Sequence, residues 1–141
     1  MTQYGLKTTR PGMVIPLPDT DFSEERVLAY TDLMNAKHPI HVDEAYSKKT
    51  SFGRRIAHGP MAMAASLAPL GEIYGENLIA MLNVRGWSFL QAIFLGEVLK
   101  TEACVLDVDR GRGAVTLEIR IYNPNGQIAQ RGEVGLLLRR D

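Results

Sequence analysis

The sequence predicts an α+β fold in which a curved antiparallel sheet wraps around one long helix. Four runs of strand-forming residues fill the second half of the chain, at 79–89, 98–108, 115–122 and 128–138. A helical segment at 59–74 is apolar on nearly all sides, so we expect most of its surface to be buried. A helix of about 16 residues spans roughly 24 Å, which is about the length of a strand of seven or eight residues.

The strand pattern is clearest at 115–122, where aliphatic residues alternate with polar or aromatic ones at the period of a half-buried strand. Arg-Gly-Arg-Gly at 110–113 and Asn-Pro-Asn-Gly at 123–126 supply turns on either side. Gly86 within the first run predicts a β-bulge. We expect four consecutive strands, joined by tight turns into one antiparallel sheet.

The first half of the chain reads mainly helical from residue 23 to residue 77. Ser23, followed by acidic residues, predicts an N-cap and a short helix that runs to about Met34. Asp43 is predicted to cap a second short helix at 44–49. Pro60 suits the first turn of the long helix, which Pro69 should kink or end.

The segment 1–20, before these helices, is punctuated by Pro and Gly around the apolar piece 13–15, which is typical of an edge strand or an extended arm.

Composition excludes several classes of protein. The 141 residues are expected to form a single domain, 1–141, and the 16 basic and 16 acidic residues give a net charge of zero. This balance gives no electrostatic reason to expect nucleic acid or an anionic membrane as a partner. No apolar run has the length of a membrane span, and residues 1–12 lack the apolar block of a signal peptide. Cys104 is the single cysteine and is predicted to be a buried thiol, so a cytoplasmic location is expected.

Two motifs point to a chemistry. In His-Pro-Ile-His-Val-Asp at 38–43, Pro39 stiffens the loop that carries His41, and Phe-Gly-Arg-Arg-Ile-Ala-His-Gly at 52–59 ends in Gly59 at the start of the long helix. An imidazole has an unperturbed pKa near 6.5, which suits proton transfer. A helix N-terminus offers free N–H groups and a positive dipole end, which suit negative charge developing on an oxygen.

These motifs resemble those of the MaoC-like dehydratases, a family that includes the (R)-specific enoyl-CoA hydratases. The family signature contains an Asp, then Asn- or His-Pro-Ile-His-x-Asp, then Phe-Gly-x-x-Ile-Ala-His-Gly. A later segment, 87–98, is similar to the family's RFxxPVxxGD pattern, with Ala92 in place of Pro and Glu97 in place of Asp. The resemblance implies the hotdog fold, which agrees with the sheet and helix inferred above.

The resemblance also implies an activity, the addition of water to a trans-2-enoyl thioester or its removal. His41 would act as the acid or base on the water, and the backbone N–H of Gly59 would donate to the thioester carbonyl. Coenzyme A or a carrier-protein arm would belong to the substrate, with no other cofactor. No metal is expected, because the three histidines lack zinc-site spacing. A homodimer, a larger hotdog oligomer or a second hotdog chain is expected to cover the sheet edge.

One position departs from the family pattern, because the residue five places before His41 is Ala36 and not the catalytic Asp. Asp32 lies one helical turn earlier, and we predict that it replaces this acid, although a solvated helix carboxylate is the other interpretation. Asn35 could hold a water but does not ionise at neutral pH. His58 either contacts substrate or orients the loop before the helix.

Several basic residues have two possible roles, because they either bind coenzyme A phosphates or form a solvated face. These residues are Lys48, Lys49, Arg54, Arg55 and Arg85.

Three functions stay open at this point. The first is a lyase with an altered catalytic acid, and the second is a non-catalytic or half-site hotdog subunit that supports a partner. The third is a thioesterase-like reaction in the same cleft, since a fold does not fix a function.

Overall fold

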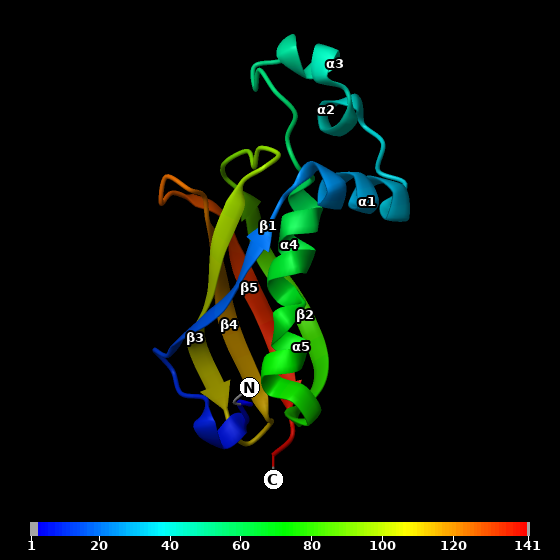
Figure 1. The fold of residues 1–141 in the computed structure, drawn as a ribbon. Coiled ribbons are helices and arrows are strands. Elements are labelled where there is room, and N and C mark those ends of the chain that lie inside the picture. Colours follow the sequence, from blue (N-terminus) through cyan, green and yellow to red (C-terminus); the bar gives the residue numbers. More distant parts are fainter. Residues whose placement is uncertain (1–2, 141) are drawn as a thin grey trace.

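The computed structural model describes residues 3–140 and has an antiparallel sheet that curves around one interrupted helix (Figure 1). The α+β prediction is therefore confirmed. The five strands lie in the order β1-β3-β4-β5-β2. Their bounds are β1 Val14–Asp21, β2 Leu78–Phe89, β3 Val98–Asp109, β4 Ala114–Tyr122 and β5 Ile128–Leu138.

The connection between β2 and β3 differs from the prediction. Strands β3, β4 and β5 are sequential neighbours, as expected, but β2 pairs with β5 at the far edge of the sheet. Residues 90–97 form a long crossover and not a tight turn. The Gly86 bulge is confirmed, since this residue has φ of 60° and the register shifts between Arg85 and Ser88.

The predicted N-terminal edge strand is present as β1, and it is longer than the apolar piece at 13–15. Among residues 3–140 it pairs with β3 alone, and its register shifts between Leu17 and Thr20. Pro16 and Pro18 fit within it because an edge strand has one side on which no ladder N–H is needed.

The long helix consists of α4 (Gly59–Leu67) and α5 (Pro69–Tyr74), with the predicted interruption at Pro69. Its contacts with the sheet form the core, where the inward residues of β4 are at most 1% exposed: Val115, Leu117, Ile119 and Ile121. Burial of the helix is less complete than expected. Ala64 and Ala68 are exposed, because the sheet covers the helix from one side only.

Three short helices lie beyond the end of the sheet, beside the start of α4: α1 (Glu24–Met34), α2 (Pro39–Val42) and α3 (Glu44–Lys48) (Figure 1). Both predicted caps are present, since the Ser23 hydroxyl accepts from the Arg26 N–H at 3.3 Å and the Asp43 carboxylate accepts from the Tyr46 N–H at 3.0 Å. Two single-turn 3₁₀ helices, η1 (Leu6–Thr8) and η2 (Gly75–Asn77), complete the elements.

Cys104 lies buried on β3, as predicted. Among residues 3–140, no helix is both long and apolar enough to cross a membrane.

Candidate active site

His41 lies in the single turn of α2, and its ring has a fixed tautomer. Nδ1–H donates to the carbonyl oxygen of Ile56 at 2.7 Å. Because a carbonyl only accepts, Nδ1 carries the hydrogen and Nε2 of the neutral ring is an available acceptor. Burial is the main reason that the pKa of His41 lies below its ordinary 6.5, with further lowering by the nearby His58 and His38 and an opposing effect of the bond to Ile56. His41 is therefore a neutral base at neutral pH.

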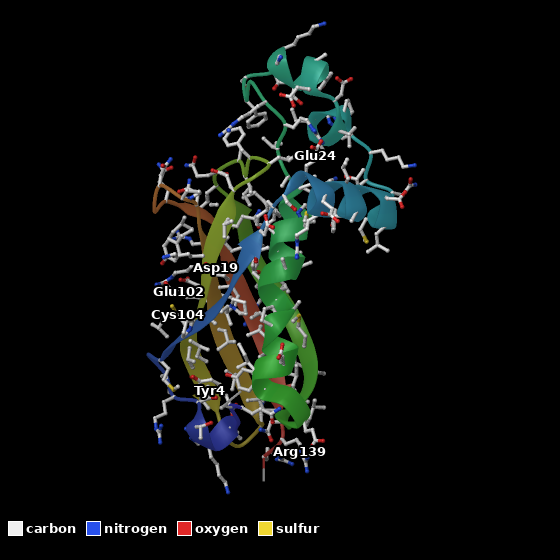
Figure 2. All side chains as sticks on the ribbon, viewed as in Figure 1. Tyr4, Asp19, Glu24, Glu102, Cys104 and Arg139 are labelled. Carbon is white, nitrogen blue, oxygen red and sulfur yellow. The ribbon has the colours of Figure 1, made fainter. Side chains whose placement is uncertain are left out.

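Arg55 holds the backbone of His41. Its Nε–H donates to the His41 carbonyl oxygen at 2.9 Å, and its Nη1 forms an ion pair with Glu24 at 2.5 Å. Figure 2 shows Glu24 at the end of the sheet where the three short helices lie. The Arg55 side chain is 11% exposed, and Arg54 stacks over the ring of Phe94 at 3.9 Å. Arg55 is thus engaged in fixing the His41 loop.

His58 links three segments beneath His41. Its ring is 4% exposed and stacks on the His41 ring, with centroids 3.6 Å apart and planes inclined by 24°. Its Nε2 lies 2.9 Å from the Ala36 carbonyl oxygen and 3.2 Å from the Thr31 hydroxyl. The carbonyl requires a hydrogen on Nε2, so Nδ1 of the neutral ring is a buried acceptor, and it has no partner among the described residues. These contacts favour the orienting role for His58.

Gly59 follows His58 and is the first residue of α4. Its N–H makes no hydrogen bond within residues 3–140, as expected of a first-turn donor. Gly59 is one of the residues that line a cavity of about 460 Å³, whose walls are largely aromatic and aliphatic, from side chains that include Phe52, Ile56, Phe89, Leu90 and Ile93. The stack of His41 on His58 places the imidazole beside the residue that precedes this free donor.

The other predicted site residues lie apart from this group. Asp32 is exposed on α1, and its carboxylate makes no hydrogen bond or ion pair with His41 or His58 within the described chain. The α1 residues that reach His58 are Thr31, through its hydroxyl, and Tyr30, through its ring. Asn35 is exposed and ends α1 in the left-handed conformation, with φ of 54°.

Arg85 lies in a separate groove on β2, together with Arg131, Glu118 and Glu133. Roles for Asp32, Asn35 and Arg85 stay predictions.

Three residues at the site were missed at the sequence level. Thr31 contacts His58, and Gln130 and Trp87 connect β5 and β2 to Gly59. Gln130 and Gly59 are 71 positions apart, so no local pattern could have joined them.

Comparisons with known proteins agree with this description. The model of the MaoC like domain family matches residues 6–122. An (R)-specific enoyl-CoA hydratase from Aeromonas caviae is 28% identical over 113 residues, which are 79% of this chain and 83% of the relative.

Two solved structures have the same fold. The unliganded R-hydratase PhaJ1 from Pseudomonas aeruginosa has a TM-score of 0.86 at 22% identity, covering 97% of this chain and 86% of that one. The ChsH1–ChsH2 complex from Mycobacterium tuberculosis has a TM-score of 0.81 at 14% identity, covering 93% and 99%. The family match spans most of the sheet and both site motifs, and this chain therefore belongs to the MaoC-like domain family, with the hotdog fold of its dehydratases.

Proposed function

We propose that this protein adds water to a trans-2-enoyl thioester, or removes it from a 3-hydroxyacyl thioester, of the acyl-CoA class. The observation that carries the proposal is the position of His41. Its ring has a fixed tautomer and stacks on His58, the residue directly before the free N–H of Gly59. The apolar cavity beside Gly59 suits an acyl chain. The enoyl-CoA hydratase from Aeromonas caviae supports the same reaction class.

The proposed steps begin with proton transfer from water to Nε2 of His41, while the water oxygen bonds to C3 of the enoyl group. Electrons of the double bond move toward the thioester carbonyl, whose oxygen gains negative charge. The Gly59 N–H and the N-terminal dipole of α4 stabilise this charge, and one such donor is typically worth about 10²–10³ in rate. Protonation of C2 then completes the addition.

Ala36 has no ionisable side chain, so another group must supply that last proton. The imidazolium of His41 can return the proton that it took from water. Asp32 is the alternative, although its carboxylate would have to reach the substrate from the exposed side of α1. For the remaining polar residues, we propose that Asn35 holds a water and that Arg85 meets the coenzyme phosphates.

The test is a hydration assay of the purified chain with trans-2-enoyl-CoA esters of increasing acyl length. We expect turnover by the wild type and its loss in His41→Gln. Activity destroyed by Asp32→Asn but retained in Asn35→Ala would assign the acid to Asp32. No turnover by the wild type, with turnover gained in Ala36→Asp, would reject the lyase proposal and indicate a silenced site.

Self-association is the second part of the proposal. Within the described part of the chain, edge strand β2 pairs with β5 only. Five of its large apolar side chains are exposed: Ile79, Met81, Leu82, Val84 and Phe89. An unpaired apolar edge of this length favours pairing with another strand, and two antiparallel β2 strands satisfy a two-fold axis. We propose a homodimer, and a stable monomer in sedimentation equilibrium would contradict it.

A supporting subunit is the alternative function, and the loss of an ionisable residue at Ala36 favours it. The ChsH1–ChsH2 complex gives a precedent for a chain of this fold in a complex of two different proteins. Turnover that appears only after mixing with a second hotdog chain would support this alternative. For the location, a cytoplasmic setting remains our expectation from the single buried Cys104.

A further inference from the structure

We propose that Gln130 and Trp87 are positioning residues that fix the direction of the Gly59 N–H donor, an inference that rests on the role proposed for Gly59. The Trp87 indole N–H donates to the Gln130 side-chain oxygen at 2.9 Å. The Gln130 side-chain nitrogen in turn donates to the Gly59 carbonyl oxygen at 3.1 Å. Gln130 is 2% exposed, so water does not compete for these groups.

The two hydrogen bonds of Gln130 set the orientation of its side-chain amide. An indole N–H only donates, so it selects the oxygen end of the amide. The nitrogen end then faces Gly59, whose carbonyl only accepts. Without Trp87, a rotated amide could bring its own oxygen against the Gly59 carbonyl, where two acceptors repel. Trp87 therefore decides which end of Gln130 meets α4.

The strands hold both side chains in place. Gln130 on β5 pairs with Phe89 on β2 and with Ile121 on β4. The indole of Trp87 packs directly over Gly132, where an added Cβ would overlap the ring. The Trp87–Gln130 pair is thus held in place by the sheet, and the hydrogen bond from Gln130 to Gly59 holds the first turn of α4 against it.

Gly59 needs such an external support. A glycine has no side chain to limit its backbone rotation, and it occurs here at a helix end, where intrahelical bonds are incomplete. Pro60 follows and carries no N–H that could anchor the same turn. The bond from Gln130 restrains the Gly59–Pro60 peptide plane, which contains the Gly59 carbonyl. The Gly59 N–H lies in the preceding peptide plane, which is joined to the restrained one at the Gly59 Cα, so the bond narrows the range of directions open to this N–H. Neither Gln130 nor Trp87 needs to touch the substrate for this role.

Three variants separate the two hydrogen bonds. Gln130→Glu keeps the shape and the acceptor for Trp87 and removes the donor to Gly59 once its carboxyl ionises, and because burial raises a carboxyl pKa, Gln130→Met is run beside it to remove the donor at any pH. Trp87→Phe removes the indole N–H and part of the ring. Gln127→Glu is the matched control, because it makes the same chemical change at an exposed position of the β4–β5 turn. Thermal melting identifies any variant that does not fold.

Three measurements test the proposal. For turnover of crotonyl-CoA, we expect Gln130→Glu to lower kcat by about tenfold or more, with KM changed less than about threefold, because displacement of an oxyanion donor affects the transition state most. The second measurement uses butyryl-CoA with a ¹³C-labelled carbonyl, an unreactive analogue. When this analogue is bound to Gln130→Glu, we expect its C=O stretching frequency to lie closer to the value in water than the frequency in the wild-type complex does. Trp87→Phe should show both effects more weakly, and Gln127→Glu neither.

The third measurement does not depend on turnover. The ¹H–¹⁵N resonance of Gly59 should shift or broaden in Gln130→Glu and Trp87→Phe but not in the control. An unchanged Gly59 resonance, or a lower kcat with an unchanged carbonyl stretch, would overturn the positioning role. If the wild type neither binds butyryl-CoA nor turns over crotonyl-CoA, the proposed function fails, while the Gly59 resonance still decides whether the pair fixes this amide.

Discussion

Replacement of Gly59 by alanine tests how closely the start of α4 packs against the sheet. Gly59 is not among the glycines with positive φ, so its backbone is open to alanine. In a helix interior, alanine is favoured over glycine by about 1 kcal/mol. The obstacle is steric, because the added Cβ would lie 2.7 Å from Cδ1 and 2.9 Å from Cε1 of Phe89. Carbon atoms pack best at about 3.5–4.0 Å, so the two groups must separate by about 1 Å.

The consequence for the rate follows from that displacement. A misplacement of about 1 Å at a reacting group can cost on the order of 10² in rate. We therefore expect Gly59→Ala to lower kcat/KM for an enoyl-CoA ester by about 10². Overpacking typically costs about 1–3 kcal/mol, and the helix preference of alanine offsets part of it. The free energy of unfolding should thus fall by no more than about 2 kcal/mol, as measured with urea.

Phe89 provides the control for this experiment. Its shortening in the double variant Gly59→Ala/Phe89→Ala removes the overlap, so kcat/KM should recover by about tenfold relative to Gly59→Ala. Phe89→Ala alone reports the separate effect of opening the cavity. The reasoning is refuted if Gly59→Ala retains the wild-type kcat/KM, or if the double variant recovers nothing although Phe89→Ala alone is active.

Four further predictions concern the histidine side of the site. His41→Gln should lower kcat by about 10²–10⁴, the usual contribution of a general acid–base residue, with an unchanged circular dichroism spectrum. Because burial places the pKa of His41 below 6.5, the acid limb of kcat/KM should lie below pH 6.5, and a limb at pH 7 or above would contradict this assignment. The same lowered pKa makes its contribution to stability complete above about pH 6.5 and lost as the pH falls through the folded-state value, which urea titrations at pH 5 and 7 can measure. Arg55→Ala removes the bond to the His41 carbonyl. A hydrogen bond from a charged group is worth about 1.5–3 kcal/mol, and the ion pair with the exposed Glu24 adds little to this. We therefore expect the free energy of unfolding to fall by an amount in that range and kcat to fall as well. An Arg55→Ala chain as stable and active as the wild type would argue against this support of the loop.

The strands and helices could be predicted because their signals are local. Alternation at 115–122, the caps at Ser23 and Asp43, and the interruption at Pro69 each depend on residues within a few positions of one another. The partner of β2 could not be predicted in the same way. β2 pairs with β5, and the crossover at 90–97 that follows β2 has no local turn signal that would show this pairing.

The candidate site could be predicted where its residues belong to the two motifs. It could be predicted less well where it depends on the point at which α1 ends. His41 stacks on His58, which directly precedes Gly59, and all three residues lie within the motifs. The helical spacing of Asp32 and Ala36 assumes a continuous helix, but α1 ends at Met34 and the chain turns at Asn35. Ala36 therefore lies outside the helix and contributes only its carbonyl to the site.

The bond between His41 and the Ile56 carbonyl has a stereochemical consequence. With Nδ1 occupied, the neutral imidazole exchanges protons through Nε2 alone. If His41 both removes the proton from water and supplies C2, the new oxygen and the new hydrogen must approach the double bond from the side on which that single nitrogen lies. Hydration in deuterium oxide would then add deuterium to C2 and hydroxyl to C3 from the same face of the double bond. The configurations of C2 and C3 in the product would show this syn addition.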